Sequence, residues 1–185
     1  MTIVRNFKAE LAFSKGVVAA TCEATLLAMI PGAERVEKTK LEEDLSGIDY
    51  KVHLDSGVVV NIDHKARRAG CARYWMHGPE ISLEVWSVKP KGRADGKIGW
   101  TLDSAKQTHY TFHTFDPVDW ILAYLFPFQL LRMTFKRCGR DWYSQYKHDV
   151  QDSGAWKSEC LFVPVSVLEY ELTRTQRTSL KGATA

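Results

Sequence analysis

The amino-acid sequence predicts an α/β sandwich in which a central mixed β-sheet is flanked by helices. Two kinds of apolar pattern indicate this class. Helical spacing of apolar residues marks residues 15–30, 117–137 and 165–172. Strand-like apolar runs occupy residues 35–39, 45–68, 81–88, 108–115 and 160–163. The chain has 185 residues, 45% of them hydrophobic, and no linker or repeat interrupts it, so we expect a single domain spanning residues 1–185.

The predicted helices should cover the sheet with apolar faces. The first helix is expected to pack five side chains on the sheet: Val17, Val18, Leu26, Leu27 and Ile30. The helix at 117–137 is expected to bury four residues at near-helical spacing: Trp120, Tyr124, Phe128 and Leu131. Its aromatic side chains are therefore interpreted as core rather than as base-stacking platforms. The polar segments 69–80 and 89–97 are interpreted as loops that either border a substrate or are simply solvated.

Residues 45–68 predict a β-hairpin. Two apolar runs are joined by the turn sequence Asp55-Ser56-Gly57. The apolar residues are Tyr50, Val52 and Leu54 before the turn, and Val58, Val59, Val60 and Ile62 after it. In an antiparallel pair with so short a turn, residues equidistant from the turn face each other. Asp49 should therefore lie beside the segment Asp63-His64-Lys65.

This hairpin brings two carboxylates and an amine to one place. Period-2 alternation directs the side chains of Asp63 and Lys65 to one face and that of His64 to the other. Two close carboxylates repel each other unless a cation lies between them, and hard oxygen ligands without a thiolate favour Mg²⁺ or Mn²⁺ over zinc. Lys65 would then polarise the attacking water or stabilise charge that develops on a phosphate. The alternative is that Asp49 stabilises a turn and that Asp63 and Lys65 belong to a solvated strand face.

The sequence around Asp49 and Asp63-His64-Lys65 resembles the PD-(D/E)XK nuclease superfamily, which has a restriction-endonuclease-like fold and includes Holliday-junction resolvases and phage nucleases. Ile48 replaces the Pro of the family name, and the second acidic residue is Asp63. The resemblance covers roughly residues 13–115 and, more loosely, residues 161–164. Beyond the hairpin, it includes Pro31-Gly32, the strand at 81–87, Gly99-Trp100 and Thr108-His109-Tyr110.

The resemblance implies roles for individual residues. Asp49, Asp63 and Lys65 would be catalytic, and the metal would be held by Glu23, Asp49, Asp63 and the backbone carbonyl of His64. Glu10 competes with Glu23 as the ligand from the first helix. The implied activity is Mg²⁺- or Mn²⁺-dependent hydrolysis of DNA, structure-selective or partner-directed, with RNA as an alternative substrate. Such proteins often form homodimers, and a compact nuclease of this kind suits a phage.

A second function class keeps the fold without cleavage, as a nucleic-acid-binding or phage inhibitor module. Two carboxylates that face phosphate would weaken a purely binding surface, so their presence favours the nuclease.

Basic residues follow directly on the acidic segment, although the net charge is only +3. Arg67, Arg68, Arg73 and Lys106 are the predicted nucleic-acid-binding residues, because guanidinium and ammonium groups hold flanking phosphates. A second basic group, Lys136, Arg137 and Arg140, lies at the end of the helix predicted at 117–137. It either contacts a distal phosphate or complements the helix dipole.

Other site chemistries find no support in the sequence. The four cysteines form no C-x-x-C pair, which argues against a structural zinc site, and we expect free thiols. His109 and His113 would lie on one face of a strand but too far apart to share a metal ion. No G-x-S-x-G or phosphate-binding Gly pattern occurs. The longest apolar stretch is too short to span a membrane, and no signal-peptide core is present, so we expect a cytoplasmic protein.

Overall fold

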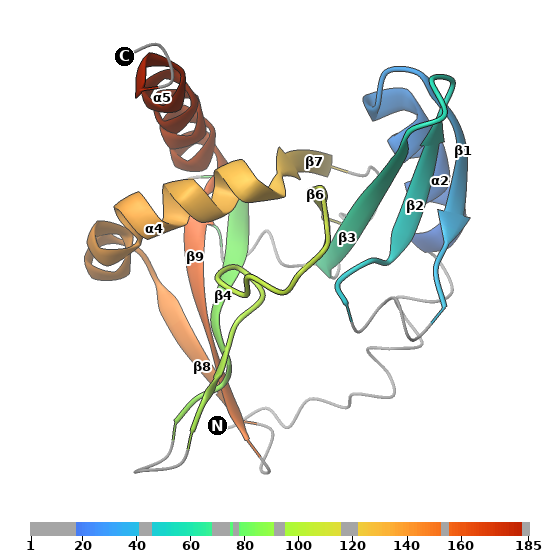
Figure 1. Ribbon diagram of the computed structural model, residues 1–185. Helices are drawn as coiled ribbons and strands as arrows, with labels where there is room; N and C mark the ends of the chain where they lie inside the picture. Colours follow the sequence, from blue (N-terminus) through green and yellow to red (C-terminus); the bar gives the residue numbers. More distant parts are fainter. Residues whose placement is uncertain are drawn as a thin grey trace. The chain divides into compact units, whose positions relative to one another are not determined.

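The computed structural model describes residues 18–40, 46–67, 75, 78–90, 95–115, 122–152 and 156–182. These residues form two compact units, each with its own β-sheet. The five-stranded unit contains α2 (Val18–Met29), β1 (Ala33–Lys38), β2 (Tyr50–Leu54), β3 (Val59–Arg67), β6 (Tyr110–Phe115) and β7 (Leu122–Pro127). The four-stranded unit contains β4 (Glu80–Val88), β5 (Lys97–Ile98), α4 (Phe128–Gln145), β8 (His148–Asp152), β9 (Lys157–Pro164) and α5 (Val165–Gly182). Figure 1 shows these elements coloured along the chain.

The sheet of the five-stranded unit is mixed, as the sequence predicts. Its strand order is β1-β2-β3-β6-β7. The pair β3–β6 is parallel, with Asp63 beside Thr111 and Lys65 beside His113, and the other neighbouring pairs are antiparallel. β1, β2 and β3 follow one another in the sequence, and so do β6 and β7, so the β3–β6 pair at the centre of the sheet joins two distant segments.

The predicted hairpin is present as β2 and β3. The amide of Leu54 donates to the carbonyl of Val58 at 2.9 Å, which closes the turn. Gly57 has a φ of 79°, a backbone conformation that costs glycine little because it has no Cβ. Tyr50 pairs with Ile62 and Val52 with Val60, so these four apolar residues share a face.

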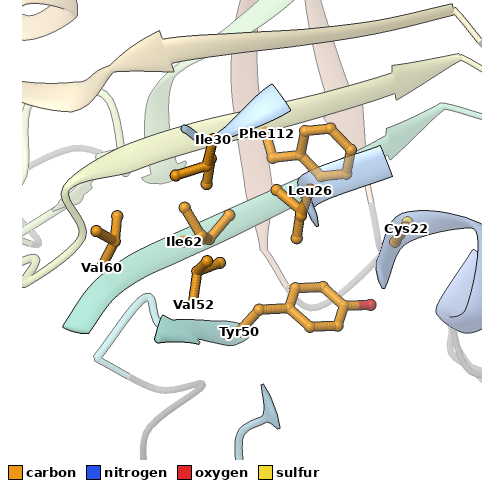
Figure 2. Close-up of a cluster of buried hydrophobic side chains, with 8 residues drawn as sticks. All are labelled: Cys22, Leu26, Ile30, Tyr50, Val52, Val60, Ile62 and Phe112. Carbon is orange, nitrogen blue, oxygen red and sulfur yellow. The ribbon is translucent and has the colours of Figure 1, made fainter. Parts of the chain in front are cut away.

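Helix α2 covers that apolar face, as expected for the first helix. Figure 2 shows the resulting buried cluster, which combines side chains of α2, β2, β3 and β6 with Ile30, the residue after α2. Its members are Cys22, Leu26, Ile30, Tyr50, Val52, Val60, Ile62 and Phe112. Leu26 and Ile30 are buried as predicted, whereas Leu27 is only half-buried. Val17 and the side chain of Val18 lie outside the described residues.

The helix predicted at residues 117–137 is wrong over residues 122–127. Residues 122–127 form strand β7, which pairs with β6, and α4 starts only at Phe128 and continues to Gln145. Tyr124 is therefore a strand residue, whereas Phe128 and Leu131 are buried on the helix. Pro127 is the last residue of β7 and directly precedes α4. Proline suits this position, because it cannot donate a hydrogen bond within a ladder and is tolerated where a helix starts. Trp120 lies outside the described residues.

The four-stranded unit corrects the expectation of one sheet. Strand β4, predicted at 81–88, pairs with β9 in a separate sheet of order β5-β4-β9-β8. The short strand β5 and the strand β8 were not predicted, and the last helix, predicted at 165–172, continues to Gly182. A buried carboxylate of β9, Glu159, is bound by the hydroxyl of Tyr143 and, at 2.8 Å, by the ammonium of Lys89.

Helices α4 and α5 contact each other through polar side chains. Thr134 and Thr175 form a buried hydroxyl pair at 3.0 Å, and Arg137 makes an ion pair with Glu171 at 2.5 Å. Because α4 continues to Gln145 and its last turn holds no basic residue, the dipole interpretation of the group Lys136, Arg137 and Arg140 is wrong. No helix in the described part of the chain is long and apolar enough to cross a membrane.

Candidate functional site

Asp63 and Lys65 form an ion pair on strand β3. The ammonium nitrogen of Lys65 lies 2.6 Å from Oδ1 of Asp63, as expected for two strand residues whose side chains share a face. The Asp63 side chain is 3% exposed and that of Lys65 is 32% exposed. The second carboxylate oxygen of Asp63, Oδ2, has no hydrogen-bond partner among the described residues. One oxygen of the buried Asp63 carboxylate is therefore paired with Lys65, and the other is buried without a donor among the described residues.

Asp49 is held against the main chain between Asp63 and Lys65. Its amide donates to the carbonyl of Ile62 at 2.8 Å, which continues the hairpin ladder beyond Tyr50. Its Oδ2 accepts the amide hydrogen of His64 at 2.6 Å. The prediction that Asp49 lies beside the Asp63-His64-Lys65 segment is therefore confirmed, with a contact to its backbone.

His64 points away from Asp63 and Lys65, as the alternation predicts. Its Nε2 lies 2.8 Å from the hydroxyl oxygen of Thr114 and 3.6 Å from the sulfur of Cys22. Burial, with a smaller contribution from the charge of Lys65, lowers the pKa of His64 to about 4. The imidazole is therefore neutral near pH 7. The amide and carbonyl of a strand residue point to the same side, so the His64 carbonyl faces the side of β3 on which Asp49 lies.

The thiol and phenol next to His64 are also kept neutral. Burial raises the pKa of the Cys22 thiol to about 11, and burial also raises the pKa of Tyr50 above its usual value. A protonated thiol is a poor nucleophile. The raised pKa of Cys22 therefore does not favour a cysteine–histidine catalytic pair here. Cys22, Cys138 and Cys160 are free thiols, and Cys71 lies outside the described residues.

Strand β6 adds two buried polar side chains to the face of Asp63. Thr111 pairs with Asp63 and His113 with Lys65 in the parallel ladder. Both side chains are buried, and the hydroxyl oxygen of Thr111 has no hydrogen-bond partner among the described residues. Burial, followed by the charges of Lys65 and Arg67, lowers the pKa of His113 well below its usual value. Sequence reasoning missed both residues because no local signal gives the β3–β6 pairing.

His109 is separate from this group. It precedes β6, and its Nδ1 accepts the amide hydrogen of Asn61 at 2.8 Å. This hydrogen bond therefore connects the segment before β6 to strand β3.

Glu23 is exposed on α2. Within the described ranges, no group of three or more His, Cys, Asp or Glu side chains is arranged to hold a metal ion. The ligand set of Glu23, Asp49, Asp63 and the His64 carbonyl therefore stays a prediction. Glu10 lies outside the described residues.

Two of the four predicted phosphate-binding residues are described. Arg67 ends β3, four positions after Asp63 and on the same face. The side chain of Lys106 lies against Gly47, where an added Cβ would come within 2.6 Å of the Lys106 Cδ. Gly47 has a φ of 81°, so glycine is favoured there on two counts. Arg68 and Arg73 lie outside the described residues.

Comparisons of the chain with protein-family models, with curated proteins and with solved structures find no match.

Proposed function

We propose that the five-stranded unit carries a divalent-metal phosphodiesterase site and that the protein is a Mg²⁺- or Mn²⁺-dependent nuclease acting on DNA. The observation that carries this proposal is the carboxylate of Asp63. One of its oxygens is paired with Lys65 at 2.6 Å, and the other is buried without a hydrogen-bond partner among the described residues. A buried carboxylate oxygen that lacks a donor is costly unless a cation or a proton binds it.

The donor set fits a hard cation. Asp63 and Asp49 offer carboxylate oxygens and His64 a backbone carbonyl, all of which suit Mg²⁺ or Mn²⁺. When bound, the metal supplies Lewis-acid polarisation of a phosphoryl oxygen and activation of a water molecule. Lys65 places a positive charge beside the same carboxylate, where it orients the water or stabilises charge on the phosphate. Arg67, with Arg68, Arg73 and Lys106, would hold neighbouring phosphates.

The assignment to the PD-(D/E)XK superfamily and its restriction-endonuclease-like fold belongs to the same proposal. It is supported by the order of elements: α2 ends just before Gly32, β1 follows, and the β2–β3 hairpin presents Asp63 and Lys65. The mixed sheet around β3 is the arrangement that the resemblance implies. The same assignment implies recognition by DNA structure or through a partner, and cutting of two strands by a homodimer.

Cleavage assays test the activity. Purified protein is incubated with plasmid, single-stranded DNA, a four-way DNA junction and RNA, in Mg²⁺ or Mn²⁺ and in EDTA. We expect metal-dependent cleavage that falls at least about 100-fold in Asp63→Asn and Lys65→Met, the range seen when a charge-stabilising group is removed. Asp141→Asn, an exposed change on α4, is the matched control and should cleave at the wild-type rate. Cleavage that survives in both site variants would exclude this site.

Metal binding is tested without any substrate. A cation that binds only the folded state raises stability by RT ln(1 + [L]/Kd). We therefore expect Mn²⁺ to raise the melting temperature of the wild type and to leave that of Asp63→Asn unchanged. Equal shifts in the two proteins would place the metal elsewhere.

The second candidate function is a nucleic-acid-binding or phage inhibitor module that does not cleave. The observation that favours it is the 2% exposure of Asp63, together with the lack of a group of three donor side chains among the described residues. In this case DNA or RNA binds without being cut. Binding to labelled DNA, in the absence of cleavage of every substrate with either metal, would select this function.

A further inference from the structure

The side chain of His64 has no part in the proposed chemistry, yet it belongs to the residue at the centre of the site. Its amide donates to Asp49 at 2.6 Å, and its neighbours in sequence are Asp63 and Lys65. The position of all three functional side chains therefore depends on where the main chain of His64 lies.

The imidazole of His64 is held by side chains from three different elements. Thr114 of β6 bonds Nε2 at 2.8 Å, and Cys22 of α2 approaches the same nitrogen at 3.6 Å. The ring packs against Phe112 of β6 at 5.2 Å and Tyr50 of β2 at 5.9 Å between centroids. Cys22, Tyr50 and Phe112 all belong to the buried cluster in Figure 2.

Contacts on several sides fix the rotamer of a strand residue and, through its Cα–Cβ bond, the local course of the strand. Thr114 is the one hydrogen-bond partner among these that comes from the parallel neighbour of β3, and it is 6% exposed. Hydrogen bonds that orient metal-ligating groups typically change metal affinity about 10- to 100-fold when they are lost, and Thr114 would act on the ligands through the main chain of His64.

We propose that His64 is a positioning residue, whose ring is anchored by Thr114 and Cys22 so that its main chain fixes Asp49, Asp63 and Lys65 in one arrangement. This inference rests on the proposed metal site for its functional meaning. The anchoring itself is independent of the metal. Among the described residues, the hydrogen-bond contacts of Thr114 and Cys22 go to His64, and in the case of Cys22 also to Tyr50, rather than to Asp49, Asp63 or Lys65.

The test compares Thr114→Val, which removes the hydroxyl at nearly constant volume, with Thr114→Ser, which keeps it. Thr101→Val is the control, because Thr101 is fully buried in the four-stranded unit and its hydroxyl has no hydrogen-bond partner among the described residues. The first readout is hydrogen exchange at the His64 amide, measured by NMR without metal. We expect exchange at least about tenfold faster in Thr114→Val, and wild-type exchange in the Ser variant and in the control.

The second readout is the affinity for Mn²⁺, measured by calorimetry. We expect Thr114→Val to bind Mn²⁺ at least about tenfold more weakly, with rescue by Ser. Unchanged His64 exchange in Thr114→Val would overturn the anchoring, whatever the metal does. Wild-type protein that fails to bind Mn²⁺ would refute the proposed metal site while the exchange experiment still decides the anchoring. Should Thr114→Val not fold, Cys22→Ala removes the second anchor and is judged by the same exchange readout.

Discussion

The ion pair between Asp63 and Lys65 predicts an unequal response to removing its two charges. Lys65→Met keeps the apolar stem but leaves the Asp63 carboxylate buried, 3% exposed, without its cation. Removing one partner of a buried pair costs about 3–5 kcal/mol. Because the Lys65 side chain is 32% exposed, water reaches this end of the pair, and we expect about 3 kcal/mol.

Asp63→Asn should cost much less. The Lys65 side chain is 32% exposed, so its ammonium keeps contact with water when the carboxylate is removed, and a charge at the surface that loses one partner costs about 1 kcal/mol or less. The two variants should therefore differ by about 2 kcal/mol, or about 30-fold in the unfolding equilibrium constant. The double variant should be more stable than Lys65→Met alone, because it removes the stranded carboxylate.

Urea unfolding in EDTA at pH 7, followed by tryptophan fluorescence and circular dichroism, measures these free energies. Lys157→Met is the matched control, because Lys157 pairs with Asp152 at 3.1 Å in an exposed ion pair. We expect the control to change stability by less than about 1 kcal/mol. Asp63→Asn as destabilising as Lys65→Met, or a double variant equal to the sum of the single changes, would refute the reasoning.

Three further outcomes are expected. The pKa of His64 is about 4 when folded against an ordinary value of 6.5, so the unfolded chain takes up the proton first as the pH falls. The share of His64 in the loss of stability should therefore appear between about pH 7 and pH 4 and reach about 2 kcal/mol at pH 5; His113, whose pKa is also lowered, adds to the loss, so in urea unfolding His64→Phe should reduce the decline without abolishing it. Gly99→Ala should cost at least about 3 kcal/mol by thermal unfolding, because the new Cβ would lie 2.1 Å from the carbonyl oxygen of Glu84; a wild-type melting temperature would contradict this. Cys22 should react with a thiol reagent at pH 8 about 100-fold more slowly than an exposed thiol, because its pKa of about 11 suppresses the thiolate, and mass spectrometry should find half-buried Cys138 labelled before Cys22.

Local signals in the sequence predicted the hairpin correctly. The turn Asp55-Ser56-Gly57 and the alternation on both sides of it act within about twenty residues, so neither distant packing nor a partner is needed to specify them. The same local geometry correctly predicted that Asp63 and Lys65 share a face while His64 points away.

Signals that depend on distant segments were not available from the sequence. The parallel pairing of β3 with β6 brings Thr111 and His113 beside Asp63 and Lys65, and no turn or spacing encodes it. The helix prediction for residues 122–127 was wrong for a different reason. An apolar run next to a helix start has no periodicity that separates strand from helix, and pairing with β6 decides the outcome.

The route of the chain between the two units has a consequence for folding. The chain leaves the five-stranded sheet after β3 and forms β4 and β5 of the other unit. Only then does it reach β6, which completes the five-stranded sheet. Ile62 and Tyr110, which are partners in the ladder, are 48 positions apart. During synthesis, the strand that carries Asp63 therefore leaves the ribosome with one edge unpaired and must wait for its neighbour. A fragment that stops before β6 would expose that edge to other chains, so aggregation of such truncations is the expected cost of this chain order.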